Sequence, residues 1–129
     1  MERSLERVKE ELLILAGRFH DFCIANDIFY SIHGGTMLGA IREKGFIPWD
    51  DDIDVTFTRD EFIKFEKTFE LHSIRDVKLS TKGLYPRLVM KRDDCPVVWI
   101  DIFIYDYITD NYILRKYKIG TNCFYCFVL

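Results

Sequence analysis

The sequence predicts one α/β (α+β) domain, built as a mixed β-sheet flanked by helices. The chain has 129 residues, which is the size of a single domain and enough to bury a core. Its composition, 49% hydrophobic and 30% charged, is typical of a folded domain rather than of a disordered or membrane-embedded chain. Hydrophobic residues recur with helical spacing in some segments and with strand spacing in others, in the order α-β-α-β-α-β-β-β, without repeats or linkers.

The first half of the chain is expected to hold two helices and two strands. Apolar residues alternate at spacings of three and four over residues 4–25, which predicts an amphipathic helix. The β-prone segment 28–32 predicts a strand that runs directly into two glycines. A short helix is expected over residues 37–43, ended by Gly45. Residues 53–57 alternate apolar and polar side chains, which indicates a strand.

The second half is expected to hold one helix and three strands. Residues 60–71 read as a helix whose phenylalanines point inward. Residues 77–80 and 84–91 predict two strands, followed by turn-forming residues at 92–96. Residues 97–105 predict a last strand, which is strongly β-prone and interrupted by one aspartate.

The charge balance argues against binding to nucleic acid. Eighteen Lys and Arg against 21 Asp and Glu give a net charge of −3, and the basic residues form no stripe. Thirteen of the 21 acids are Asp, and four of these lie between positions 50 and 54. The acidic cluster is therefore the feature that points most directly to a function.

The cysteines indicate a reducing compartment, and the C-terminal tail is apolar but short. Cys123 and Cys126 have a C-x-x-C spacing, but neither a second such pair nor a thioredoxin-like context is present, so both are interpreted as small buried apolar residues. No apolar signal segment precedes the first helix, so the four cysteines, including Cys23 and Cys95, are expected in a reducing compartment. The run Cys123–Leu129 is too short to span a bilayer, so no transmembrane segment is expected. We expect a cytoplasmic protein, or one peripheral at the inner face of the membrane. The apolar tail suggests a protein partner or an oligomer.

Two carboxylates at the start of the strand 53–57 suggest a metal site. Asp52 and Asp54 are two residues apart, so their side chains share one face of an extended chain. Two carboxylates on one face repel unless a cation lies between them, and Mg²⁺ prefers such oxygen ligands together with substrate phosphates. The alternative is a solvated acidic loop. Asp101 lies inside an apolar strand, where it either faces solvent at an edge or completes the site, and the other two carboxylates favour the second interpretation.

Gly34-Gly35-Thr36 lies between a predicted strand and a predicted helix. Glycines there allow backbone N–H groups to approach an anion closely, and a helix N-terminus favours negative charge. Alone, such a Gly-Gly pair more often forms only a turn.

The stretch His33–Asp54, HGGTMLGAIREKGFIPWDDDID, resembles the signature of the LicD family, the phosphocholine-transferase-like proteins. Residues 99–103, WIDIF, are similar to that family's second conserved block. The resemblance implies a nucleotidyltransferase-like fold in a single domain over residues 1–129. It also implies the transfer of a phospho-alcohol, commonly phosphocholine from CDP-choline, to a cell-surface glycan such as lipopolysaccharide or teichoic acid. Relatives in the fukutin group transfer ribitol phosphate.

By position, the resemblance also implies roles for individual residues. Asp52, Asp54 and Asp101 would be both catalytic residues and ligands of Mg²⁺ or Mn²⁺. The remaining candidates would contact the donor's phosphates: Gly34, Gly35, Thr36, Arg42 and Lys44.

Length is the main departure from the family, whose members are usually about twice as long. We therefore expect a truncation at the C-terminal end, which would remove acceptor contacts. Two alternatives stay open. One is a nucleotidyltransferase that moves an NMP group, and the other is a non-catalytic or incomplete donor-binding module of the same fold.

Overall fold

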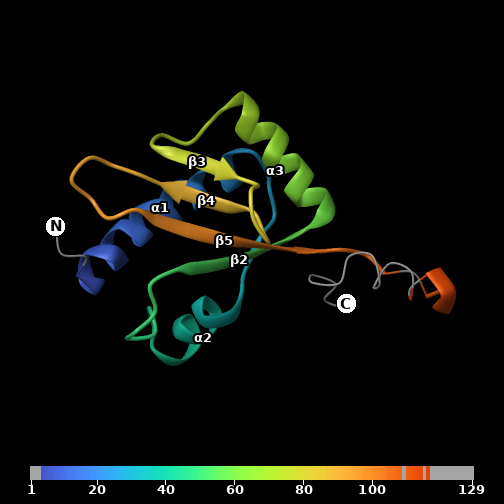
Figure 1. Cartoon of the computed structure of the whole chain (residues 1–129), viewed down its shortest axis with the longest axis horizontal. Helices are drawn as coiled ribbons and strands as arrows, with labels where there is room; N and C mark the ends of the chain where they lie inside the picture. The colour runs from blue at the N-terminus through green and yellow to red at the C-terminus, as the bar shows by residue number, and fades with distance from the viewer. Residues whose placement is uncertain (1–3, 109, 115, 117–129) are drawn as a thin grey trace.

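The computed structural model describes residues 4–108, 110–114 and 116, and contains one mixed five-stranded sheet (Figure 1). The strands lie in the order β1-β2-β5-β4-β3. The central pair β2–β5 is parallel, and the other three pairs are antiparallel. The elements are α1 (Leu5–Ala25), β1 (Ser31–Ile32), α2 (Gly34–Arg42), β2 (Ile53–Thr58), α3 (Arg59–Leu71), β3 (Val77–Ser80), β4 (Arg87–Met90) and β5 (Val98–Tyr105). The predicted fold class and order of elements are confirmed.

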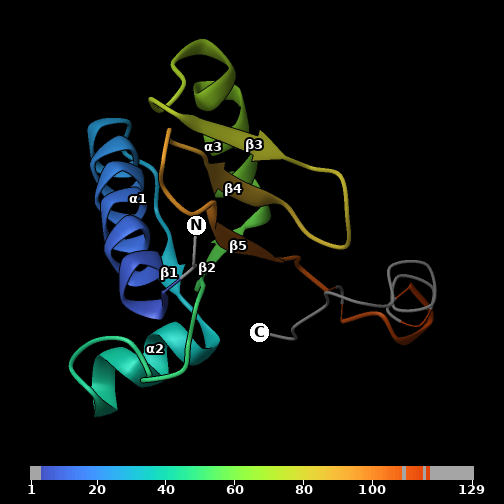
Figure 2. The ribbon, with the colours of Figure 1, turned by 60° about the vertical axis from the view of Figure 1, so that its left-hand side comes forward.

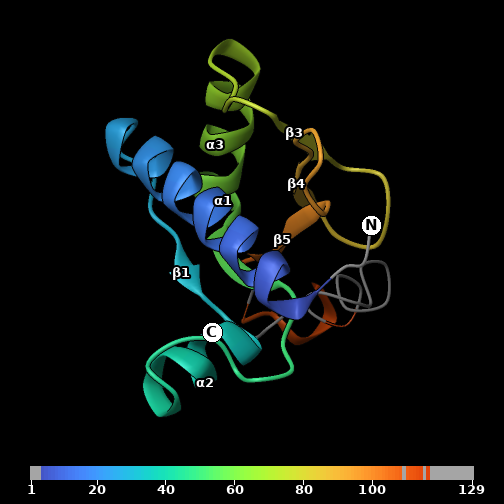
Figure 3. The same cartoon turned by 90° about the vertical axis from the view of Figure 1, so that its left-hand side faces the viewer.

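One face of the sheet packs against α1 and α3 (Figures 2 and 3). Alternate residues of β2 and β5 supply the sheet's side of this core, because side chains alternate between the faces of a strand. Phe65 of α3 is fully buried and its ring packs edge-on or tilted against Phe19, Phe57 and Phe69. The helix α2 lies apart from this pair, beside β2.

The same alternation sends the polar residues of the central strands to the other face. Ile53, Val55 and Phe57 of β2 are buried in the core, so Asp54 and Thr56 point away from α1 and α3. In β5 the residues 98, 100, 102 and 104 face the core, and Asp101 therefore also points to the opposite face. The apolar pattern that fixes the core thus also places the carboxylates together.

Two element boundaries in the first half differ from the sequence prediction. The strand expected over 28–32 is reduced to residues 31–32. The chain leaves α1 through Asp27 at φ 54°, and the N–H of Phe29 then donates to the Glu61 carboxylate at 2.7 Å rather than to a strand. The helix expected from residue 37 already begins at Gly34.

The strand expected over 84–91 is confined to residues 87–90. Leu84 is exposed, and Pro86 has no N–H to donate to a neighbouring strand. The Pro86 carbonyl still accepts from the N–H of Ile102 at 2.9 Å, which fixes the entry into β4.

Two of the four cysteines lie in the described part of the chain. Cys23 is a free, buried thiol, and its burial raises the pKa to about 12, so it behaves as a small apolar residue. Cys95 is also free. Cys123, Cys126 and the apolar tail lie outside the described residues. Among the described helices, none has the length and apolar character needed to cross a bilayer.

Candidate functional site

Three of the predicted site residues meet at the start of the central strand pair. Asp54 and Asp101 are direct partners in the parallel β2–β5 register, and Asp52 precedes β2 by one residue. Each of the three offers a carboxylate oxygen, and these oxygens all lie within 4.8 Å of one another. Asp101 is 4% exposed, and the other two are partly buried. The parallel register of β2 and β5, which sets Asp54 beside Asp101, is what builds this cluster.

The electrostatics of the cluster oppose its own ionisation. Burial raises the pKa of Asp52 to about 6, with further contributions from the charges of Asp50, Asp101 and Asp51. Burial likewise raises the pKa of Asp54 to about 6, assisted by the charges of Asp52, Asp101 and Asp50. A divalent cation would relieve this repulsion.

Arg87 is the cationic partner of the cluster, and it is not among the residues predicted from the sequence. It faces Asp101 directly in the antiparallel β4–β5 register, with its Nε donating to Asp101 Oδ1 at 2.5 Å. This contact lowers the pKa of Asp101, but burial has the larger effect and the pKa stays raised. The signal was a charged residue inside an apolar strand, the same signal that marked Asp101. The register that pairs them is not visible in the sequence.

The two glycines allow carboxylates to lie against the first turn of α2. Gly34 has φ +52°, and a Cβ there would lie 2.9 Å from Asp54 Oδ2. A Cβ at Gly35 would lie 2.7 Å from Asp50 Oδ2. Any larger residue at these two positions would displace a carboxylate. The N–H groups of this turn have no carbonyl within the helix to bind, so they favour negative charge beside them.

Thr36 fixes this helix end to β2. Its Oγ1 accepts the N–H of Asp54 at 2.8 Å, and the N–H of His33 donates to the Asp54 carbonyl at 2.9 Å. Thr36 thus holds the backbone that carries Asp54. Its predicted contact with a phosphate stays a prediction.

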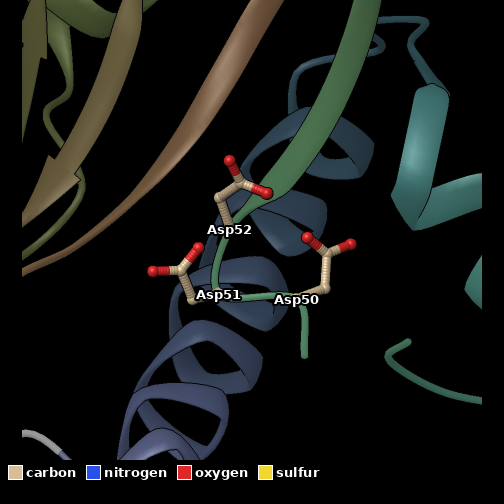
Figure 4. Close-up of side chains that lie close together, drawn as sticks. All are labelled: Asp50, Asp51 and Asp52. Carbon is tan, nitrogen blue, oxygen red and sulfur yellow. The ribbon is translucent and has the colours of Figure 1, made fainter. Parts of the chain in front are cut away.

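The loop between α2 and β2 carries a second group of carboxylates. Asp50, Asp51 and Asp52 also offer oxygens within 4.8 Å of one another, so Asp52 belongs to both groups. In Figure 4 the side chains of Asp50 and Asp51 point to different sides of the chain, and Asp52 points along β2. Lys9 of α1 holds the loop by donating to the carbonyls of Ile47 (3.2 Å) and Pro48 (2.7 Å).

Within the described residues, neither Arg42 nor Lys44 forms an ion pair with the three carboxylates. Arg42 ends α2, about 12 Å along the helix axis from Gly34, and its Nη2 lies 3.7 Å from Glu43 Oε1. Lys44 lines a cavity of about 450 Å³ under α2, which Gly35 and Asp50 also line. The structure therefore brings neither cation into the Asp52–Asp54–Asp101 group, and their role as phosphate contacts stays a prediction.

His33 lies on the same face of the sheet as Asp54. Its Nδ1 is 3.2 Å from the Tyr105 hydroxyl, and its ring centroid is 4.9 Å from that of Phe103. These two β5 residues orient the imidazole on this face of the sheet.

The donor set fits a hard divalent cation. Carboxylate oxygens alone form the group, which suits Mg²⁺ or Mn²⁺ rather than a metal that prefers nitrogen or sulfur ligands. The glycine turn leaves space for Asp54 that a Cβ would fill. Asp52, Asp54 and Asp101 are thus the residues suited to hold such an ion.

The fold and site define an α/β domain in which a mixed sheet presents carboxylates beside a glycine-led helix. Residues 27–120 match the family model described as "LicD/FKTN/FKRP, nucleotidyltransferase domain", and the chain belongs to this LicD family. It is 39% identical over 104 residues to the lipopolysaccharide cholinephosphotransferase LicD of Haemophilus influenzae, an alignment that covers 68% of this chain and 39% of the relative.

Two further relatives are uncharacterized Rickettsia proteins. The one from Rickettsia prowazekii is 30% identical over 124 residues, covering 79% of this chain and 44% of the relative. The one from Rickettsia typhi is 29% identical over 106 residues, covering 82% of this chain and 32% of the relative. The chain thus spans less than half the length of each of these three relatives.

Proposed function

We propose that this chain carries the donor site of a metal-dependent phosphotransferase that moves a phospho-alcohol to a glycan. We further propose phosphocholine as the transferred group, CDP-choline as the donor and a cell-surface glycan as the acceptor. The observation that carries the proposal is the group Asp52, Asp54 and Asp101, with oxygens within 4.8 Å, next to the first turn of α2. The relative that is a lipopolysaccharide cholinephosphotransferase supports the transferred group and the acceptor class.

The reaction joins an acceptor hydroxyl oxygen to the distal phosphorus of the donor, breaks the diphosphate linkage and releases CMP and a proton. A bound Mg²⁺ or Mn²⁺ would neutralise charge on the phosphate oxygens. Asp52, Asp54 and Asp101 would hold that ion. The N–H groups that begin α2 would position phosphate oxygens, and Thr36 keeps that helix end against the strand of Asp54.

The test is CMP release from CDP-choline with Mg²⁺, in the presence of lipopolysaccharide or teichoic acid as acceptor. We expect Asp54→Asn to lower turnover by at least about a hundredfold, since it removes a charged ligand. Asp106→Asn is the matched control, because Asp106 follows the same strand pair but binds Arg59. Equal turnover in wild type and Asp54→Asn would contradict the assignment.

Turnover and thermal melting together separate the two alternatives. Turnover of free NTPs, with transfer of NMP and no reaction of CDP-choline, would indicate a nucleotidyltransferase. An Mg²⁺-dependent rise in Tm with CDP-choline but no CMP release would indicate a donor-binding module, since a ligand that binds only the folded state raises Tm.

A further inference from the structure

Arg87 has one terminal nitrogen, Nη1, that no residue in the described part of the chain binds. Its Nε donates to Asp101 Oδ1 at 2.5 Å, and its Nη2 donates to the Tyr85 hydroxyl at 3.2 Å. Its Nη1 donates to no residue in the part of the chain that the structure describes. The side chain is 43% exposed, whereas that of Asp101 is 6% exposed. The Nε of the guanidinium is therefore bound to Asp101, and the Nη1 of the same charged group is available to bind a ligand.

Two aromatic rings hold this guanidinium in place. Its central carbon lies 5.1 Å from the centroid of Tyr85 and 5.6 Å from that of Trp99. Cation–π contacts at these distances favour a fixed position for the planar group. Arg87 is thus a preorganised donor, unlike an arginine that is free to sample solvent.

The position of Arg87 also suits an anion that is shared with a metal ion. Arg87 pairs with Asp101, and Asp101 pairs with Asp54, so the three side chains form a row across β4, β5 and β2. Adjacent strands are about 4.8 Å apart, so the row spans roughly 10 Å. A diphosphate bound to a cation among the carboxylates would lie within reach of Arg87, at the β4 end of this row.

We propose that Arg87 is a substrate-binding residue whose Nη1 donates to a phosphate oxygen of the donor's diphosphate while its Nε keeps Asp101 in place. The identity of the donor rests on the proposed function, whereas the recognition of a diphosphate beside the cation site does not. An arginine suits the two tasks because its donors point in fixed, different directions, and a lysine ammonium lacks this fork.

The test compares diphosphate binding with metal binding in the same variants. Inorganic pyrophosphate and CDP-choline are titrated calorimetrically at saturating Mn²⁺, and Mn²⁺ affinity alone is measured by electron paramagnetic resonance. The variants are Arg87→Gln and Arg87→Lys. Arg59→Gln is the matched control, because Arg59 is also 43% exposed and pairs with Asp106 at 2.6 Å, about 16 Å further along the strands.

We expect Arg87→Gln to weaken pyrophosphate binding about tenfold or more, with Mn²⁺ affinity changed by less than about threefold. Arg87→Lys should bind pyrophosphate about three- to tenfold more weakly than wild type, since a lysine ammonium reaches either Asp101 or the phosphate but not both. Arg59→Gln should bind pyrophosphate as wild type does. If Arg87→Gln does not fold, the pyrophosphate affinity of Arg87→Lys shows whether Arg87 binds the diphosphate.

Three results would overturn the proposal. These are wild-type protein that does not bind pyrophosphate, Arg87 variants that bind it normally, and Mn²⁺ affinity that falls as far as pyrophosphate affinity. The last result would mean that Arg87 only orients Asp101. The proposed function fails separately: Arg87-dependent binding of pyrophosphate without binding of CDP-choline supports the role of Arg87 and rejects that donor.

Discussion

At the scale of single residues, the carboxylates work against the stability of the metal-free fold. Asp52 and Asp54 have pKa values raised from 3.8 to about 6, first by burial and then by neighbouring charges. Between about pH 4 and 6 the folded state therefore binds more protons than the unfolded state. The stability that these groups contribute falls as pH rises through that window, and the cost is full at pH 7.

This sign gives a prediction for Asp54→Asn in EDTA. At pH 7 the variant should melt roughly 3–6 °C above wild type, because it removes a partly buried charge from a repelling cluster. Near pH 4 the advantage should vanish, since the wild-type carboxyls are then neutral. Thermal melts at both pH values, followed by circular dichroism, provide the measurement. A variant less stable than wild type at pH 7 would show that Asp54 supports the fold.

The sequence predicts these carboxylates better than it predicts their cationic partner. Asp52 and Asp54 share a face because side chains alternate along an extended chain, and this relation is local. The contact between Arg87 and Asp101 depends on the register of two strands, which only the folded sheet defines. The pairing of Arg87 with Asp101 is therefore a part of the site that sequence reasoning misses.

At the scale of elements, the junction of α2 and β2 joins the glycine turn to the carboxylates. The sequence places the helix start at residue 37, because two glycines are poor helix formers. The structure starts α2 at Gly34, where the missing Cβ atoms leave room for Asp54 and Asp50. The two glycines are thus part of the helix despite their low helix propensity, and their missing Cβ atoms allow Asp54 and Asp50 to lie close to its first turn.

Thr36→Val tests this junction. The valine keeps the shape but removes the oxygen that accepts the Asp54 N–H at 2.8 Å. We expect a loss of about 1–2 kcal/mol in the free energy of unfolding, because a part-buried donor loses its partner. Urea denaturation measures the loss, and Thr36→Ser is the control that retains the hydroxyl. If both variants unfold alike, the hydrogen bond does not hold the junction.

At the scale of the whole molecule, the two faces of the sheet differ in role: one face forms the hydrophobic core, and the other carries the candidate site. The face that packs against α1 and α3 holds the apolar core, including Phe65 among several aromatic rings. The opposite face carries Asp54, Asp101 and Arg87. Because the spacing of apolar residues distinguishes helices from strands, the sequence was sufficient to predict the fold class. It did not predict the pairing order of the strands.

This separation predicts that stability and metal binding can be lost independently. Phe65→Ala should lower the free energy of unfolding by about 3–5 kcal/mol, since Phe65 is fully buried, yet the folded fraction should bind Mn²⁺ with near-wild-type affinity. Asp54→Asn should show the reverse, with weakened Mn²⁺ binding and an intact fold. The Mn²⁺ Kd, measured well below each variant's Tm, and urea unfolding provide the two readouts. Phe29→Ala is the surface control, because Phe29 is 80% exposed and should change neither. If Phe65→Ala weakens Mn²⁺ binding as strongly as Asp54→Asn does, the core and the carboxylate face form one coupled unit.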